Sequence, residues 1–209
     1  MPPHIIRFAD LAPARWRNGG GTTVEIARGS HPGAVQPAGG DWDWRLSIAE
    51  VERAGDFSSF EGMDRVLTVI DGELLVLTVD GREHGLERYR PLRFDGGAPA
   101  SAVLPTGPIR DLNLITRRGA CTGYVTILEL SKKRALPLGP GQLGVLLQGD
   151  AVAAPGMGAD GGATTSAQDD SATPLARYDT VVGGEPAPTV SGRGFLAVVS
   201  VVEAEQAEA

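Results

Sequence analysis

Short β-type runs separated by glycine turns constrain the fold of this chain most strongly. Run 65–70 is followed by Asp71-Gly72, and run 73–79 is followed by Asp80-Gly81. Two such runs joined by Asp-Gly form a strong hairpin signal, because glycine accepts the positive φ that a tight primed turn requires. With 29 Gly and 15 Pro among 209 residues, the chain turns too often for long helices. Many short strands predict an antiparallel barrel or sandwich.

The second half of the chain repeats this pattern in weaker form. Run 124–130 reads as a strand, run 143–154 as a hairpin that turns at Gly149-Asp150, and run 195–202 as a closing strand. We interpret this as a degenerate internal repeat of a small β-barrel, although any two all-β stretches look alike. The predicted domains are residues 1–118 and 119–209. A mobile loop is expected over about 154–174, where small and polar residues bury too little apolar surface to offset the entropy of ordering.

Charge and cysteine content narrow the classes of partner. The chain has 19 basic and 26 acidic side chains, a formal net charge of −7. A general phosphate-backbone binder would have the opposite sign, so we expect no nucleic-acid partner. The single cysteine, Cys121, excludes an internal disulfide framework and a thiolate zinc cluster. No run approaches the ~20 apolar residues of a membrane helix, and the start lacks a signal-peptide core. We therefore expect a cytoplasmic protein without a membrane partner, and a homodimer is left open.

The stretch Asn18-Gly19-Gly20-Gly21 is the most unusual in the chain. Three consecutive glycines are entropically costly unless the backbone must turn tightly or let another group approach closely. Successive N–H groups in such a turn can bind an anion. A phosphate-binding P-loop is excluded, because no Gly-Lys-Ser/Thr follows and no βαβ unit surrounds the stretch. A binding role and a sharp turn into the strand at 22–27 both remain open.

The histidines give no sign of a metal or of a histidine-dependent catalytic triad. Zinc and iron need three or more fixed ligands, whereas His4, His31 and His84 are scattered without ligand spacing. We therefore expect no metal and no other cofactor, and we assign no catalytic residue.

Polar side chains interrupt strands that are otherwise apolar. Arg45 and Ser47 share one face of run 44–49, Asp111 and Asn113 share one face of run 109–116, and Arg65 begins a third strand. Buried charges need partners or a ligand, and arginine with Asp and Asn suits a carboxylate or amide site. The alternatives are a structural Arg–Asp pair or faces exposed to solvent, since a period of two does not show which face points inward.

Several blocks of sequence keep a specific order between residues 15 and 118. The blocks are RWRNGGGTTVE (15–25), WRLSIA (44–49), GDFSSFEGMDR (55–65), GPIRDLNL (107–114) and RR (117–118). Together they resemble the HutD/Ves family. Asp56 and Glu61 stand at turn positions where a proline is common in the family.

The resemblance implies an all-β, RmlC-like bicupin of two fused antiparallel barrels with little helix. It also implies a link to bacterial histidine utilisation, as a non-catalytic modulator that senses a small carboxylate such as N-formylglutamate. One alternative is a metal-free cupin enzyme acting on a formamide or amide, with Asp111 as general base and Arg45 or Arg65 stabilising an oxyanion. A protein-interaction module is the other. The expected ligand-binding residues are Asn18, Arg45, Ser47, Arg65, Asp111 and Asn113.

Overall fold

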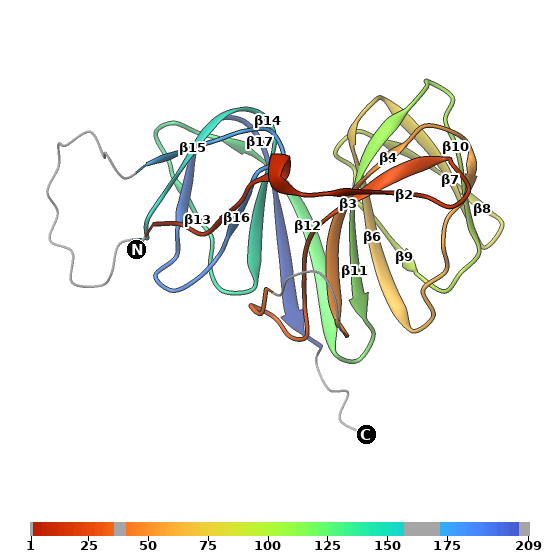
Figure 1. Ribbon diagram of the computed structural model, residues 1–209, viewed down its shortest axis with the longest axis horizontal. Coiled ribbons are helices and arrows are strands. Elements are labelled where there is room, and N and C mark those ends of the chain that lie inside the picture. The colour runs from red at the N-terminus through yellow and green to blue at the C-terminus, as the bar shows by residue number, and fades with distance from the viewer. Residues whose placement is uncertain (1, 36–40, 157–171, 205–209) are drawn as a thin grey trace, which may run out of the picture. The chain divides into compact units, whose positions relative to one another are not determined.

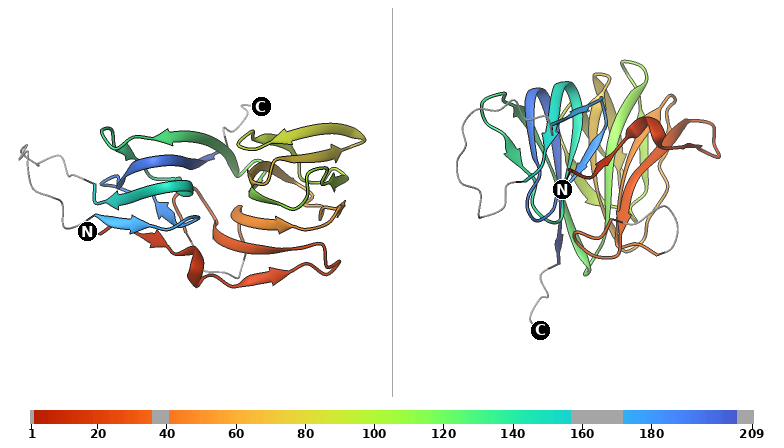
Figure 2. Two further views of the ribbon diagram at one scale, coloured as in Figure 1. Left: turned by 90° about the horizontal axis from the view of Figure 1, so that it is seen from above. Right: turned by 60° about the vertical axis from the view of Figure 1, so that its left-hand side comes forward.

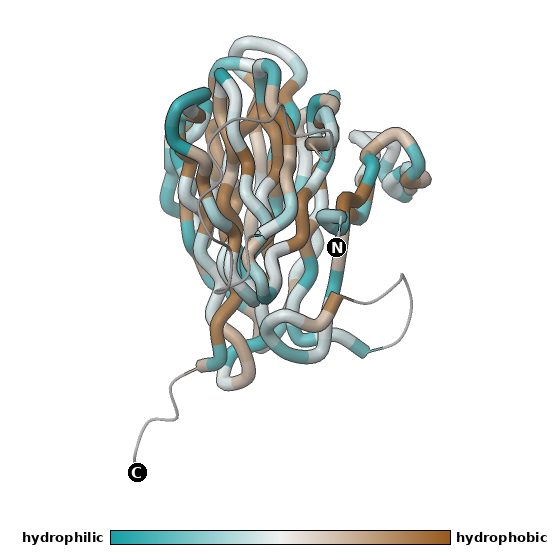
Figure 3. Tube along the Cα trace, turned by 90° about the vertical axis from the view of Figure 1, so that its left-hand side faces the viewer, coloured by the Kyte–Doolittle hydropathy of each residue, from teal (hydrophilic) through white to brown (hydrophobic). Residues whose placement is uncertain are grey.

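The computed structural model describes residues 2–35, 41–156 and 172–204, and these residues form β-strands almost throughout (Figure 1). The single helix among them is a 3-10 turn, Phe8–Asp10 (η1), so no helix in the described part of the chain could cross a bilayer. Hydrophobic residues concentrate along the strands and hydrophilic residues at the turns (Figure 3). The predicted all-β class with little helix is confirmed.

The contacts within the chain divide it into two compact units. One comprises residues 11–125 and 201–209, and the other comprises residues 1–10 and 126–200. We call them the 11–125 unit and the 126–200 unit. This division differs from the predicted domains 1–118 and 119–209. Residues 119–125 join the first unit, and Ile5 and Ile6 pair with Val181 and Thr180, late in the sequence. Most of the loop expected at 154–174 lies outside the described residues, although Thr173–Leu175 forms strand β15.

The 11–125 unit contains two sheets that share one apolar core. In spatial order, the six-stranded sheet is β2 (Pro13–Arg15), β3 (Gly21–Gly29), β4 (Trp44–Val51), β11 (Ile109–Arg117), β6 (Met63–Asp71) and β9 (Leu92–Asp95). The four-stranded sheet is β5 (Gly55–Asp56), β10 (Ala100–Val103), β7 (Leu74–Val79) and β8 (Arg82–Glu87). Leu67 and Val69 of the first sheet belong to the same buried cluster as Leu75 and Leu77 of the second.

The two Asp-Gly turns of this unit have different roles. Asp80 and Gly81 both have positive φ, 48° and 75°, and they join β7 to β8 in a two-residue hairpin. The hairpin expected at Asp71-Gly72 is wrong. Strand β6 pairs with β9 and β11 instead, and Gly72, with a φ of 85°, carries the chain from one sheet to the other.

The 126–200 unit is built around one long strand pair. In order, its sheet is β1 (Ile5–Ile6), β16 (Thr180–Val182), β14 (Gln142–Ala154), β17 (Thr189–Glu203) and β12 (Cys121–Leu130), and β12 and β17 both continue beyond this unit. Strand β13 (Leu136–Pro137) pairs with β17, and β15 pairs with β14. Leucine and valine side chains, including Leu146 and Leu196, fill the core of this unit.

The first residues are fastened to this unit by a buried carboxylate. Ile5 and Ile6 pair with Val181 and Thr180, so the chain start lies beside the light-blue strands in Figures 1 and 2. Asp179 accepts hydrogen bonds from Arg7 Nη1 at 2.6 Å, from the Phe8 amide at 3.0 Å and from the Ala176 amide at 2.9 Å. This carboxylate therefore joins segments about 170 positions apart in the sequence.

The hairpin expected at Gly149-Asp150 is also wrong, because β14 continues through both residues and pairs with β17 on either side of them. Gly149 has a φ of 99°, and a Cβ there would lie 2.0 Å from the carbonyl oxygen of Arg193. We expect Gly149→Ala to lower the free energy of unfolding by about 2 kcal/mol, from overpacking and an unfavourable φ. Urea denaturation measures the change. Gly184→Ala is the control, since nothing lies within 4 Å of that position, and equal losses in both variants would contradict the prediction.

Candidate functional site

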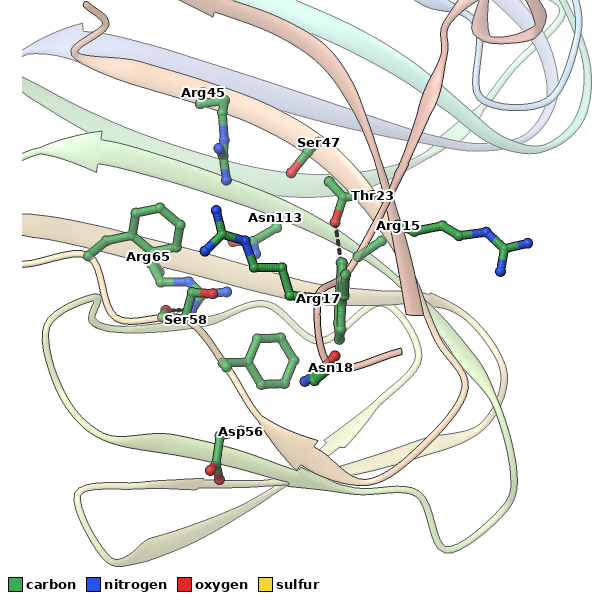
Figure 4. A pocket seen from close by; sticks show the side chains of 14 residues that line it. Arg15, Arg17, Asn18, Thr23, Arg45, Ser47, Asp56, Ser58, Arg65 and Asn113 are labelled. Carbon is green, nitrogen blue, oxygen red and sulfur yellow. Dashed lines mark hydrogen bonds between the residues drawn. The ribbon is translucent and has the colours of Figure 1, made fainter. Parts of the chain in front are cut away.

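A pocket of about 490 Å³ lies within the 11–125 unit (Figure 4). Side chains of β3, β4, β6 and β11 form its floor, and segments 15–18 and 56–60 form its walls. Five of the six predicted ligand-binding residues line it: Asn18, Arg45, Ser47, Arg65 and Asn113. The sixth, Asp111, does not.

Strand register explains why these side chains meet. Ile115 of β11 pairs with Arg45 on β4 and with Arg65 on β6. Two residues along the strand, Asn113 pairs with Ser47 on β4. Because side chains alternate between the two faces of a strand, these polar residues occupy one face of three adjacent strands. Leucines such as Leu114 fill the opposite face and are also buried, so the period of two could not distinguish inside from outside.

Arg65 is the most deeply buried cation of the pocket, with 2% of its surface exposed. Its guanidinium lies 5.1–5.5 Å from the ring centroids of Phe57, Phe60 and Phe94, within cation–π range. Nη1 donates to the Ser58 carbonyl oxygen at 3.3 Å, whereas Nε is buried without a hydrogen-bond partner. Burial lowers the pKa of Arg65 to about 10, although nearby Asp111 opposes this shift.

Two further guanidinium groups face the same space. Arg45 lies over the rings of Trp42 and Phe60, at 5.2 and 5.3 Å, and its Nε is buried without a partner. Burial lowers the pKa of Arg45, an effect that Glu25 opposes. Figure 4 shows Arg17 pointing into the pocket. The pocket therefore concentrates positive charge in a protein of net charge −7.

The neutral polar groups differ in their availability to a ligand. Asn113 Oδ1 is buried and has no hydrogen-bond partner, and Ser47 is buried beside it in the register. Asn18 Oδ1 already accepts from the Gly20 amide at 3.0 Å. Asn113 Oδ1 is therefore available to accept from a ligand, whereas Asn18 Oδ1 is already used within its own loop.

The triple-glycine stretch has a structural role in this loop. The Gly19 amide donates to the Trp16 carbonyl oxygen at 3.1 Å, and the Gly20 amide is taken by Asn18. A Cβ at Gly21 would lie 2.1 Å from the carbonyl oxygen of Glu50, so β4 approaches too closely for any other residue. Trp16 Nε1 donates to Thr23 Oγ1 at 2.8 Å, and both residues line the pocket. These contacts support the sharp-turn interpretation rather than an anion site made of backbone amides.

Asp111 lies behind the lining rather than in it. It is completely buried, it is flanked in the register by Ala49 and Val69, and neither carboxyl oxygen has a hydrogen-bond partner. Burial raises the pKa of Asp111 to about 7, and Arg65 opposes the shift. Asp111 is therefore the one predicted ligand-binding residue that does not line the pocket. It belongs to the correct strand face but lies too deep among apolar residues.

Comparison with known proteins identifies the family. Residues 8–197 match the model of the HutD family. The chain belongs to the HutD family. It is 38% identical over 116 residues to Protein Ves of Citrobacter koseri, and 40% identical over 112 residues to an uncharacterized 21.2 kDa protein in the hutC 3′ region of Pseudomonas putida. The matches span 54% and 53% of this chain and 58% and 56% of those relatives. The resemblance to HutD and Ves proteins is confirmed.

Solved structures resemble nearly the whole length of this chain, whereas the sequence matches above span about half of it. HutD from Pseudomonas fluorescens SBW25, determined in a formate condition, matches with a TM-score of 0.73 and 28% identity, over 96% of this chain and 98% of that one. A Cupin 2 conserved barrel domain protein from Leptotrichia buccalis matches with a TM-score of 0.57 and 10% identity, over 98% of each chain. The second match shows the fold alone, and that fold is of the cupin type.

The aromatic lining of the pocket has no signal in the alternation of strand residues. Phe57, Phe60 and Trp16 lie in loops between strands, and so do Arg17 and Ser58. The available signal was their position inside the blocks that resemble the family. In the described part of the chain, no three His, Cys, Asp or Glu side chains gather as metal ligands.

Proposed function

We propose that this HutD-family protein binds a small carboxylate metabolite in the pocket and modulates histidine catabolism without catalysing a reaction. The observation that carries the proposal is the Arg65 guanidinium, buried among three phenylalanine rings with its Nε lacking a partner. A buried cation that lacks a full set of partners is costly. A carboxylate matches the planar fork of arginine and would supply the missing acceptors.

The pathway part of the proposal draws on the relative from Pseudomonas putida, whose description places it in the hutC 3′ region. N-formylglutamate is the intermediate we favour, because its carboxylates match the arginines and its formamide matches Asn113. A general base must reach the proton it removes. Asp111 lies outside the lining, so the geometry favours binding over the enzymatic alternative.

Arg65→Lys tests the assignment of the pocket. N-formylglutamate at ~100 times its dissociation constant should add ~2.7 kcal/mol to the stability of the wild-type protein. For a chain of about 200 residues, this corresponds to a rise in melting temperature of roughly 5–10 °C. Lysine keeps the charge but loses the planar fork, so this increment should shrink strongly in the variant. Differential scanning fluorimetry measures both increments.

Arg15→Lys is the matched control, because Arg15 borders the pocket but points away from it (Figure 4). Its increment should equal that of the wild type. A purely structural Arg65 would lower the unliganded melting temperature on substitution and leave the increment intact. That result would refute the assignment, as would the absence of any shift with histidine, urocanate, formiminoglutamate or N-formylglutamate.

A further inference from the structure

The Asp111 carboxyl is a buried acid that neither the fold nor the pocket lining uses directly. It is completely buried, and both of its oxygens lack hydrogen-bond partners. Most buried polar groups in proteins are hydrogen-bonded, and buried carboxylates are normally paired. A fully buried carboxyl without such a pair therefore needs another explanation.

The surroundings of Asp111 leave one charged group to act on it. On its two sides in the sheet lie Ala49 of β4 and Val69 of β6. The four-stranded sheet contributes apolar residues to the same core, among them Leu77 of β7 and Ala102 of β10. The charge that favours ionised Asp111 is that of Arg65 on β6, and the same interaction favours charged Arg65.

The neighbouring ionisable groups act elsewhere. Arg45 of β4 acts on Arg65 rather than on Asp111. Arg110, the neighbour of Asp111 on β11, forms an ion pair with Glu50 at 3.3 Å. The protonation state of Asp111 therefore depends on the positive charge of Arg65, and on whether another anion neutralises that charge.

A carboxylate bound at Arg65 would weaken the electrostatic stabilisation that Arg65 gives to ionised Asp111. Its negative charge would offset the arginine, and ionised Asp111 would then face a like charge in a medium of low dielectric. We propose that Asp111 takes up one proton from solvent when a carboxylate binds, and that it acts through Arg65 as a positioning residue without touching the ligand. The inference rests on the proposed function. An O–H bond forms on Asp111 while the buffer acid or water that supplies the proton loses its own bond to hydrogen, and no bond breaks in the ligand.

The direction of the resulting pH dependence follows from linkage. The pKa of Asp111 is about 7 in the unliganded protein, and it rises further when the anion binds. Below about pH 7, Asp111 is protonated in both states and the affinity is constant. Above that value the affinity falls with rising pH, by up to tenfold per pH unit, until the pKa of the liganded state is passed.

Isothermal titration calorimetry with N-formylglutamate tests the coupling. Titrations at pH 8 in phosphate and in Tris, which differ in ionisation enthalpy, give the number of protons taken up per ligand. We expect a clear fraction of one proton for the wild-type protein and none for Asp111→Asn. Between pH 7 and 8, well below the pKa of Arg65, the affinity of the variant should stay constant, whereas that of the wild type should fall several-fold. Asp80→Asn, a change in the exposed β7–β8 turn outside the pocket, should retain the proton uptake.

The outcomes separate the two proposals. Wild-type binding without proton uptake, or equal uptake by Asp111→Asn, would overturn the coupling and leave the binding function standing. Failure of all four candidate metabolites to bind the wild type would overturn both. If the variant does not fold, carboxyl ¹³C NMR of the wild type decides, because the titration midpoint of Asp111 must move to higher pH when N-formylglutamate is added. An unmoved midpoint would overturn the coupling.

Discussion

Replacing Asp111 by asparagine is expected to raise the free energy of unfolding at pH 8 by about 4 kcal/mol and to change it little near pH 4. Burial raises the pKa of Asp111 from 3.8 to about 7, and each pKa unit corresponds to about 1.4 kcal/mol. The folded protein therefore holds a proton on Asp111 that the unfolded chain releases throughout this interval. Asparagine resembles the protonated acid in shape and does not titrate.

The sign of the effect sets the shape of the stability curve. Between about pH 4 and 7 the folded state binds more protons than the unfolded state, so wild-type stability should decrease as the pH rises. Above about pH 7 both states are deprotonated at Asp111, and its contribution becomes constant. Urea denaturation at several pH values measures the curve. Asp80→Asn, a change in the exposed β7–β8 turn, is the control and should follow the wild-type curve. A stability curve for Asp111→Asn that runs parallel to the wild-type curve between pH 4 and 7 would refute the prediction.

Asp179→Ala should lower the free energy of unfolding by about 3 kcal/mol. The substitution removes three hydrogen bonds at a carboxylate that is 2% exposed, and it leaves the Phe8 and Ala176 amides without their acceptor. Breaking a buried ion pair by removing one partner costs about 3–5 kcal/mol. We take the lower end, because the Arg7 side chain is 37% exposed and can be solvated.

Hydrogen exchange locates this effect within the molecule. Amides of residues 5–8 should lose protection before the rest of the 126–200 unit, since Asp179 joins them to β16. Asp10→Ala, in the exposed end of the 3-10 turn, is the control and should behave as wild type. Uniform loss of protection across the unit would show that Asp179 does not fasten the first residues specifically.

The candidate site was predictable wherever polar residues interrupt strands. Arg45 and Asn113 can be recognised because they are polar residues within otherwise apolar strands. The strand register places both in one pocket. Asp111 follows the same pattern but lies deeper, and alternation alone gives no depth. Phe57 and Phe60 could not be found in this way, because they lie in a loop, where side chains do not alternate with a fixed period.

The fold was predictable at the level of its class, and less so in its connections. Asp-Gly with positive φ occurs both at Asp80-Gly81, in a hairpin, and next to Asp71, where the chain changes sheets. The two turns are alike in sequence. They differ in backbone conformation, since Asp80 has a positive φ and Asp71 does not, and in that β7 pairs with β8 whereas β6 pairs with β9 and β11. The pairing of Ile5 with Val181 is equally invisible to local patterns, because its partners are separated by most of the sequence.

That pairing has a consequence for biosynthesis. On the ribosome, β1 emerges long before β16, so Ile5 and Ile6 can pair only after Thr180 and Val181 have been synthesised. Closing so long a loop adds an entropic barrier, and contacts of high sequence separation form slowly. The 11–125 unit, made of nearly contiguous residues, can complete most of its sheets during translation. Vectorial synthesis should therefore yield an early intermediate in which the arginine pocket is assembled while the chain start is still undocked.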